Sequence, residues 1–381
     1  MAVAKHVFLI AGEASGDLLG ARLIADLKAR DANLYYSGIG GPKMQQAGCK
    51  IILPSEQLAV MGLWEVLIYA FTIFRALQLV KRYLITTHPD LIVLIDFAGF
   101  NLKVAKIAQA LNIKVLFYVS PKIWAWNYRR IHKIKQFVNH MAVLFPFEVA
   151  LYQQVRLPVT FVGHPLTEMI PEQTPASLLP YQNLKLNPNL PVIGILPGSR
   201  KQEIKYLMPT LIATCEIIQQ QLPGVQFVLP LAPTLDRKLF DSYKLAHIKI
   251  ITQDAHTVLP LCHAAIICSG TATLETALFK VPMVIVYRMN WLSYLLARLL
   301  VKVKFIGLCN IVAQREVAKE FIQQAANPKS ISEEIVRLIK KKDYRAQRIA
   351  LLMQVRRNLT EGVQAQPIAE LANKLLKNSF L

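Results

Sequence analysis

Residues 7–17 read VFLIAGEASGD, and this stretch decides the fold class. An apolar run precedes a turn of small residues, and LLGARLIADLKA after the turn has helical spacing. A buried strand, a glycine turn and a helix form the repeating unit of parallel α/β sheets, and such a turn usually binds an anion. This turn carries the carboxylates of Glu13 and Asp17, which repel a phosphate. The stretch therefore predicts an α/β fold and leaves the ligand of the turn open.

The same unit recurs along the chain. Further apolar strand candidates follow at 34–39, 91–96, 115–119, 141–145, 159–163, 192–197, 226–230, 248–251, 264–268 and 282–287. Continuous apolar strands that alternate with helices indicate parallel sheets covered on both faces. We therefore predict an α/β chain with two Rossmann-like domains whose parallel sheets face each other across a cleft.

The segment 171–191 interrupts this alternation. It is rich in Pro, Asn and Gln and has no sustained period, as expected for an interdomain linker. We therefore place one domain at 1–170 and the other at 192–340. The remainder, 341–381, reads as a basic helical tail that packs back on the first domain.

The composition of the chain limits the classes of molecule that it is expected to bind. Of 381 residues, 54% are hydrophobic, and the net charge of +20 suits nucleic acid, anionic lipid or phosphorylated small molecules. No nucleic-acid-binding signature is present, so an anionic membrane surface is the expected partner and nucleic acid is not. No uncharged apolar run reaches the ~20 residues of a membrane span, and the N-terminus does not read as a signal peptide. We expect a cytoplasmic chain with reduced cysteines and, lacking C-x-x-C or H-E-x-x-H, no metal.

Two turns in the second domain have the chemistry of phosphate sites. In ILPGSRKQEI (195–204) a strand ends and PGSR opens a helix, whose N-terminus and Arg200 both suit an anion. The other interpretation is a capped helix with a surface arginine. In ICSGTATLE (267–275), Thr271 and Thr273 can donate to a phosphate.

Glu275 follows in the first turns of the same helix. Its carboxylate can accept both hydroxyls of a ribose, or it can simply complement the helix dipole. Two phosphate-type turns in one domain favour a nucleoside diphosphate. The absence of G-x-G-x-x-G disfavours a nicotinamide cofactor.

The first domain offers a carboxylate at a strand end. In LIVLIDFAGFN (91–101), Asp96 ends a buried strand and is either a general base or a structural aspartate that bonds loop amides. Asn101 can cap the next helix. The stretch YVSPKIWAWNYRR (118–130) is either a lipid or sugar contact or a packed loop.

Two segments, 60–85 and 291–305, are more apolar than packing on one sheet requires. On a helical wheel of the first, four polar side chains fall on roughly one narrow stripe: Glu65, Thr72, Arg75 and Arg82. Both segments are either buried core helices or a surface that lies in the bilayer interface, and the charge of the chain favours the interface. The side chains expected to face the membrane are Val66, Ile68 and Phe71.

Taken together, these stretches closely resemble the lipid-A-disaccharide synthases, bacterial glycosyltransferases of family 19 with the GT-B fold. Nine motifs match in order: GEASGD, MGLWEVL, IDFAGFN, YVSPKIWAW, LFPFE, VGHPL, LPGSRKQEI, SGTATLE and YRM. The match runs from about residue 7 to the helical tail. Each motif alone is weak, whereas nine in order are highly specific.

The resemblance implies a reaction. A diacylated glucosamine passes from UDP to diacylglucosamine 1-phosphate, giving a β-1,6-linked disaccharide 1-phosphate and UDP with inversion. In the family pattern Asp96 matches the base and Arg200 the essential phosphate-binding arginine. The positions implied to bind UDP are Gly198, Ser199, Arg200, Ser269, Gly270, Thr271, Thr273, Glu275 and Asn310. Those assigned to the acceptor are Glu13, Ser15, Asn101 and Glu65.

The resemblance also implies that no cofactor or metal is needed, and that the enzyme sits peripherally on the cytoplasmic face of the inner membrane. A homodimer is left open. GEASGD becomes part of the wall that holds the acceptor sugar, with Asp17 more a helix cap than a ligand. A UDP-sugar epimerase of the same fold and a non-catalytic lipid-binding protein are the alternatives.

Two positions depart from the family pattern. Ala98 replaces the usual proline in D-x-P-x-F-N, which we expect to loosen the turn after Asp96 only slightly. Lys319 replaces the glutamate of a V-P-E motif, which places a lysine near the rim of the expected cleft.

Overall fold

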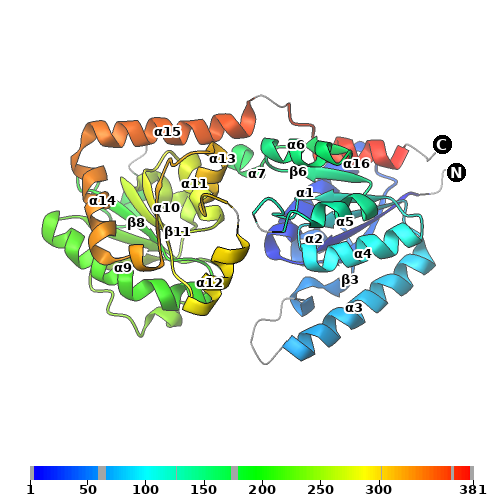
Figure 1. The fold of residues 1–381 in the computed structure, drawn as a ribbon, viewed down its shortest axis with the longest axis horizontal. Helices are drawn as coiled ribbons and strands as arrows, with labels where there is room; N and C mark the ends of the chain where they lie inside the picture. Colours follow the sequence, from blue (N-terminus) through cyan, green and yellow to red (C-terminus); the bar gives the residue numbers. More distant parts are fainter. Residues whose placement is uncertain are drawn as a thin grey trace. The chain divides into compact units, whose positions relative to one another are not determined.

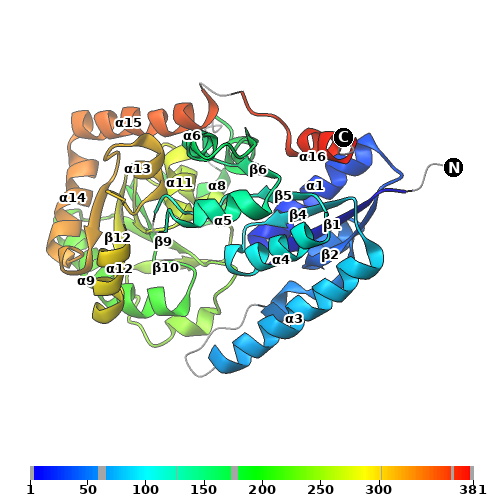
Figure 2. The same ribbon diagram turned by 45° about the vertical axis from the view of Figure 1, so that its right-hand side comes forward.

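The computed structural model describes residues 4–58, 66–125, 127–172, 179–301, 303–361 and 364–377. The chain forms two compact units, Met1–Gly163 with Gly362–Leu381, and His164–Glu361 (Figures 1 and 2). The division therefore falls a few residues before the expected boundary at 170. The expected tail is split between the units, because 341–361 belong to the second and Gly362–Leu381 to the first.

The first unit contains a seven-stranded parallel sheet in the order β3-β2-β1-β4-β5-β6-β7. Its strands are β1 (His6–Ala11), β2 (Tyr35–Gly40), β3 (Lys50–Pro54), β4 (Leu91–Ile95), β5 (Val115–Tyr118), β6 (His140–Val143) and β7 (Val159–Phe161). Its helices are α1 (Ala14–Arg30), α2 (Pro42–Gln46), η1 (Ser55–Leu58), α3 (Val66–Thr87), α4 (Ala98–Ala110), α5 (Arg130–Phe137), α6 (Pro146–Gln154) and α16 (Ile368–Lys377).

The second unit contains a six-stranded parallel sheet in the order β10-β9-β8-β11-β12-β13. Its strands are β8 (Val192–Leu196), β9 (Gln226–Pro230), β10 (Ile248–Ile251), β11 (Ala264–Cys268), β12 (Met283–Tyr287) and β13 (Lys319–Ile322). Its helices are α7 (Pro165–Met169), α8 (Leu179–Asn183), α9 (Lys201–Gln221), η2 (Arg237–Phe240), α10 (Ala255–Val258), η3 (Leu259–Leu261), α11 (Thr271–Leu278), α12 (Trp291–Leu300), α13 (Leu308–Ala313), η4 (Gln323–Ala325), α14 (Pro328–Lys340) and α15 (Lys342–Thr360).

Burial explains why these sequences form parallel sheets. Every residue of β1, β4, β8 and β11 is buried, as continuous apolar strands require when helices cover both faces. The helices contribute one apolar stripe each, and in α3 that stripe is Ile73, Ala76, Val80 and Leu84. The predicted α/β class with two Rossmann-like sheets is confirmed.

The end of the chain divides at α15 and α16. Helix α15 packs on α11, α13 and α14 within the second unit, whereas α16 packs on α1 in the first. There the Lys114 Nζ donates to the carbonyl oxygen of Leu375 at 2.8 Å. The segment taken as a linker also contributes to the second unit, because Leu184 and Leu186 are buried there.

Strand order locates the places where a ligand can bind. Chain order reverses between β1 and β4 in the first sheet, and between β8 and β11 in the second. In open parallel sheets, the crevice outside the carboxyl ends of such neighbouring strands is the usual ligand site. The turns after β1, β4, β8 and β11 are therefore where a ligand is expected to bind.

Candidate active site

The GEASGD turn follows β1, and its three polar side chains separate by environment. Glu13 and Ser15 are exposed at the start of α1, and Glu13 makes no side-chain cap bond. Asp17 is buried, and its carboxylate accepts the backbone N–H groups of Gly41, Lys43 and Met44 at 2.8–3.0 Å. Asp17 therefore anchors the start of α2, whereas Glu13 and Ser15 remain available to a ligand.

Asp96 follows β4, the strand next to β1. Asp96 and Phe97 have φ values of 48° and 43°, a left-handed conformation that is costly for residues other than glycine. Gly12 allows this turn to pack, because a Cβ at Gly12 would lie 2.4 Å from the Phe97 ring. Two consecutive strained residues hold Asp96 at the switch point of the sheet.

Three neighbours set the acidity of Asp96. Burial raises the pKa of its carboxyl, the negative charge of Glu13 raises it further, and Lys122 with the Phe97 backbone opposes both. A carboxylate whose pKa is moved toward neutrality is a better general base than an ordinary surface aspartate. Ala11 and Ile95 are paired at the ends of β1 and β4, so the two turns lie side by side and the charge of Glu13 acts on Asp96.

Asn101 lies beneath this turn rather than in front of it. Its side chain is fully buried, and its Nδ2 donates to the carbonyl oxygens of Asp96 at 2.8 Å and Ile95 at 3.3 Å. Asn101 therefore supports the strained turn from inside the protein. Glu65, which was grouped with the acceptor site, lies outside the described residues.

The loop after β5 is packed. Ser120 Oγ lies 2.7 Å from Tyr152 Oη, and Trp124 Nε1 donates to Glu148 Oε1 at 3.1 Å. Burial raises the pKa of Glu148 to about 7, against its hydrogen bonds from Trp124, Phe145, Ser120 and Leu144. For Trp124 the packed interpretation holds, and the packing fixes the loop that carries Lys122.

In the second unit the GSR turn follows β8. Gly198 has φ 119°, which favours glycine, and a Cβ there would lie 2.2 Å from a Glu203 oxygen. Glu203 accepts the backbone N–H groups of Ser199 at 2.9 Å and Arg200 at 3.2 Å. The helix thus caps itself, and Glu203 already holds two of the donors expected for a phosphate.

The Arg200 guanidinium supplies a cationic group at this turn and is paired with Glu203. It is 66% exposed and lies 3.5 Å from Glu203, so it is held loosely at the start of α9. A guanidinium in this place can meet phosphate oxygens with two parallel hydrogen bonds. The positive charge of the turn therefore comes mainly from the long, exposed Arg200 side chain and from the dipole of α9.

The SGT turn follows β11, the neighbour of β8, and only part of it faces outward. Gly270 and Thr271 are exposed, whereas Ser269 Oγ donates to the carbonyl oxygen of Ile306 at 2.8 Å. Thr273 is fully buried, donates to the Gly270 carbonyl oxygen at 2.8 Å and accepts from Leu308 N. Thr273 therefore shapes the turn from within, and Thr271 is the hydroxyl presented to a ligand.

Asn310 is also internal. It is fully buried, accepts the N–H groups of Val317 and Ala318, and donates to the Ala318 carbonyl and to Glu320 at 2.7–2.9 Å. It fixes the start of β13. The departure at Lys319 has a local explanation, because its Nζ lies 2.7 Å from the nearly buried Glu334 carboxylate.

Glu275 lies one turn into α11 and is half-buried. Its carboxylate is 3.6 Å from Nε2 of His256, a residue that sequence reasoning did not single out. The only signal for His256 in the sequence is an Asp-Ala-His turn after a strand, which is too common to select it. Arg288 of the YRM motif is anchored, donating to Thr210 Oγ1 at 2.7 Å and to the Gln323 carbonyl oxygen.

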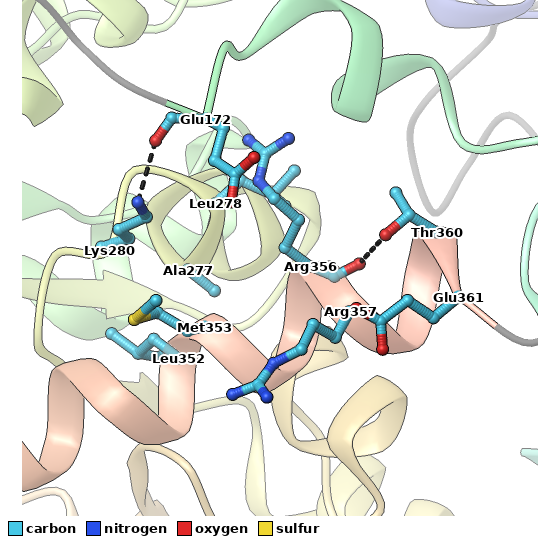
Figure 3. A pocket seen from close by; sticks show the side chains of 10 residues that line it. All are labelled: Glu172, Ala277, Leu278, Lys280, Leu352, Met353, Arg356, Arg357, Thr360 and Glu361. Atoms are coloured by element: carbon cyan, nitrogen blue, oxygen red, sulfur yellow. Dashed lines mark hydrogen bonds between the residues drawn. The ribbon is translucent and has the colours of Figure 1, made fainter.

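A separate cavity lies at the opposite end of α11. Its volume is about 570 Å³, and it is lined by Glu172, Ala277, Leu278, Lys280, Leu352, Met353, Arg356, Arg357, Thr360 and Glu361 (Figure 3). Lys280 donates to the Glu172 carbonyl oxygen and Arg356 to that of Ile170, at 2.8 and 2.6 Å. These bonds tie the chain after α7 to α11 and α15, away from the turns at the strand ends.

Within the described ranges, no three His, Cys, Asp or Glu side chains gather as a metal site. No described helix combines the length and apolarity that crossing a bilayer requires.

Comparison with known proteins identifies the family of the chain. The family described as lipid-A-disaccharide synthetase matches residues 7–374. A lipid-A-disaccharide synthase of Coxiella burnetii (strain Dugway 5J108-111) is 45% identical over 372 residues, which cover 98% of this chain and 99% of the relative.

Solved structures agree on the fold. The calicheamicin glycosyltransferase CalG4 matches with a TM-score of 0.62 at 14% identity, covering 98% of each chain. A UGT transferase from Siraitia grosvenorii in complex with UDP matches with a TM-score of 0.58 at 14% identity, covering 98% of this chain and 100% of that one. The identities are low, so these likenesses show the glycosyltransferase fold alone. The family match and the close relative settle the rest: the chain belongs to the lipid-A-disaccharide synthases, UDP-sugar-dependent glycosyltransferases of lipid A biosynthesis.

Proposed function

We propose that this enzyme transfers a diacylglucosamine from UDP to the 6-hydroxyl of diacylglucosamine 1-phosphate, with inversion at the anomeric carbon. The observation that carries the assignment is the position of the two sets of residues. Glu13 and Asp96 follow the strands at the switch point of the first sheet, and Arg200 and Thr271 follow those of the second.

In this proposal Asp96 is the general base. Its carboxylate takes the proton of the acceptor hydroxyl as the oxygen attacks the anomeric carbon from the face opposite UDP. The strained backbone fixes the carboxylate, and burial together with Glu13 raises its pKa toward the range where proton transfer is efficient. The exposed Glu13 and Ser15 can accept and donate hydrogen bonds to the other hydroxyls of the acceptor sugar.

The second unit binds the leaving group. The Arg200 guanidinium, the N-terminus of α9 and the exposed Gly270–Thr271 turn stabilise the diphosphate charge that develops as the bond to the sugar breaks. Glu275 accepts the ribose hydroxyls. Ser269, Thr273 and Asn310 act indirectly by shaping the turns. We propose that no metal is required, because the Arg200 guanidinium and the dipole of α9 supply the positive charge at this place.

We also propose that the enzyme associates with an anionic membrane surface. On α3, Phe71 and Phe74 are 54% and 57% exposed, and the Arg75 guanidinium lies 4.3 Å from the centre of the Phe71 ring. Val66 and Ile68 lie in the first turn of α3, where only the backbone is described. Exposed aromatic residues beside cations suit the interface of an anionic bilayer.

Helix α12 has the same character. Trp291, Leu295 and Leu299 recur every four residues and are all exposed, Leu299 by 80%, with Arg298 beside them. Such a stripe is costly in water unless something apolar covers it. Both helices thus support peripheral binding at the membrane where acylated substrates reside.

The test is direct. The purified enzyme is incubated with the acylated UDP-sugar and the acylated sugar phosphate, and the product is analysed by mass spectrometry and by the anomeric proton coupling in NMR. We expect a β-linked tetraacyl disaccharide monophosphate and stoichiometric UDP. An α-linked product would contradict inversion, and turnover of water-soluble UDP-N-acetylglucosamine alone would favour an epimerase.

A further inference from the structure

Glu275 accepts the ribose hydroxyls in the proposed transfer, but its contact with His256 has been given no role so far. The Nε2 of His256 and the Oε2 of Glu275 are 3.6 Å apart, and the two side chains are only 23% and 20% exposed. The imidazole also meets the Phe279 ring edge-on, with 5.5 Å between centroids, and Phe279 caps the C-terminal end of α11, four residues after Glu275. One ring is therefore packed against two successive turns of the helix that carries Glu275.

The position of His256 is itself fixed. Asp254 caps α10 and accepts the backbone N–H of His256 at 3.4 Å. Glu275, by hydrogen bonding and by charge, raises the pKa of His256 against the opposing effect of burial, and the charge of Asp254 adds to it. Among the described residues, the two elements that contact α10 most, β9 and η3, carry no ionisable side chains. Near neutral pH the ring therefore holds a proton more readily than a free histidine.

A glutamate at a ligand site gains from such a partner. Its side chain has three rotatable bonds, and fixing it on binding costs conformational free energy. A neighbour that holds the carboxylate in place beforehand removes part of this cost. A glutamate that merely complemented the dipole of α11 would need no histidine at this distance.

We propose that His256 is a positioning residue that aims the Glu275 carboxylate at the two ribose hydroxyls of the UDP-sugar. This inference rests on the proposed function, in which Glu275 accepts those hydroxyls. It implies that His256 raises the affinity for a nucleotide only when the nucleotide carries ribose hydroxyls. A role limited to packing α10 on α11 would instead alter stability and leave ribose recognition unchanged.

The experiment compares the affinities of UDP and 2′,3′-dideoxy-UDP by isothermal titration calorimetry. It uses the full-length protein, His256→Gln, Glu275→Gln and, as a matched control, His247→Gln, because His247 is exposed and lies elsewhere in the unit. The measured quantity is the ratio of the two dissociation constants. Any effect on phosphate or uracil binding cancels in this ratio.

We expect the unmodified protein to prefer UDP, and His256→Gln to lower that preference several-fold while binding dideoxy-UDP as before. His247→Gln should leave the preference intact. Measured from about pH 6 to about pH 8.5, the preference of the unmodified protein should fall as His256 loses its proton, whereas that of His256→Gln should not change.

The possible failures are distinguishable. If the unmodified protein binds both nucleotides equally, the ribose role of Glu275 fails and the proposal falls with it. If Glu275→Gln loses the preference and His256→Gln keeps it, the ribose role stands and the positioning role of His256 is overturned. Equal weakening of both nucleotides in His256→Gln would also overturn it, since that is the signature of a structural role.

Discussion

The turns at the two switch points have the same topology and opposite charge. In the first sheet the turns after the strands carry Glu13 and Asp96, whereas in the second they carry Arg200 and the small Gly270–Thr271 turn. Both turns after β1 and β8 open a long helix, and the helix dipole favours an anion at each. The side chains reverse that preference in the first unit, so topology fixes where a ligand binds and side-chain charge decides which ligand.

The largest effect is expected from Asp96→Asn. Removal of a general base typically costs about 10²–10⁴ in rate, and the amide keeps the size of the side chain in its strained turn. The measurement is kcat with both acylated substrates, with Asp26→Asn on the exposed face of α1 as the control. Turnover within a few-fold of the unmodified enzyme would remove Asp96 from the chemistry.

A smaller loss is expected from Arg200→Ala. Hydrogen bonds to charged groups contribute about 1.5–3 kcal/mol, so kcat/KM for the UDP-sugar should fall roughly 10–100-fold. Arg200→Lys should recover only part of it, because an ammonium lacks the two-pronged geometry. Lys201→Ala, at the exposed next position, is the control. If it lowered kcat/KM as much, the general positive charge of the turn, and not Arg200, would be responsible.

The next effect concerns membrane binding by the exposed aromatic side chains of α3 in the first unit. Replacing Phe71 and Phe74 by serine removes two exposed rings from the proposed interface, and each should weaken binding to anionic vesicles by about tenfold. Vesicle sedimentation measures the effect, with Met353→Ser in α15 as an exposed apolar control. Unchanged binding of the double variant would exclude α3 from the interface.

The smallest effect concerns pH. Because the charge of Glu13 raises the pKa of Asp96, Glu13→Gln should lower that pKa. Asp96 then loses its proton at a lower pH, and the acid limb of the kcat profile should move to lower pH. Glu56→Gln, an exposed residue of the same unit, should leave the limb in place. A limb that moves to higher pH in Glu13→Gln would contradict the proximity of the two carboxylates.

Much of the fold was predictable because buried parallel strands are continuous apolar runs. Strands β3 and β13 were missed, and both lie at sheet edges where their residues are only partly buried. The turns after β1, β4, β8 and β11 were found from small residues and charges at strand ends.

Which side chains of those turns face a ligand and which support the turn from inside was not predictable. From the sequence alone, Thr273 and Asn310 are expected to contact a ligand. In the structure their partners are internal, because Thr273 accepts from Leu308 N and Asn310 bonds the backbone before β13. The carboxylate of Asp17 is held by backbone N–H groups at the start of α2, and the partner of Glu275 comes from α10. Such pairings follow from tertiary packing, which a single sequence does not encode in its spacing.

The central claim is that the acidic turns serve the acceptor and the basic turns serve UDP. Calorimetric titration of UDP into Asp96→Asn and Arg200→Ala tests it most directly, because UDP lacks the acceptor altogether. The account predicts that Asp96→Asn binds UDP as the unmodified enzyme does, and that Arg200→Ala binds it at least several-fold more weakly. Weakened binding in Asp96→Asn with unchanged binding in Arg200→Ala would contradict it.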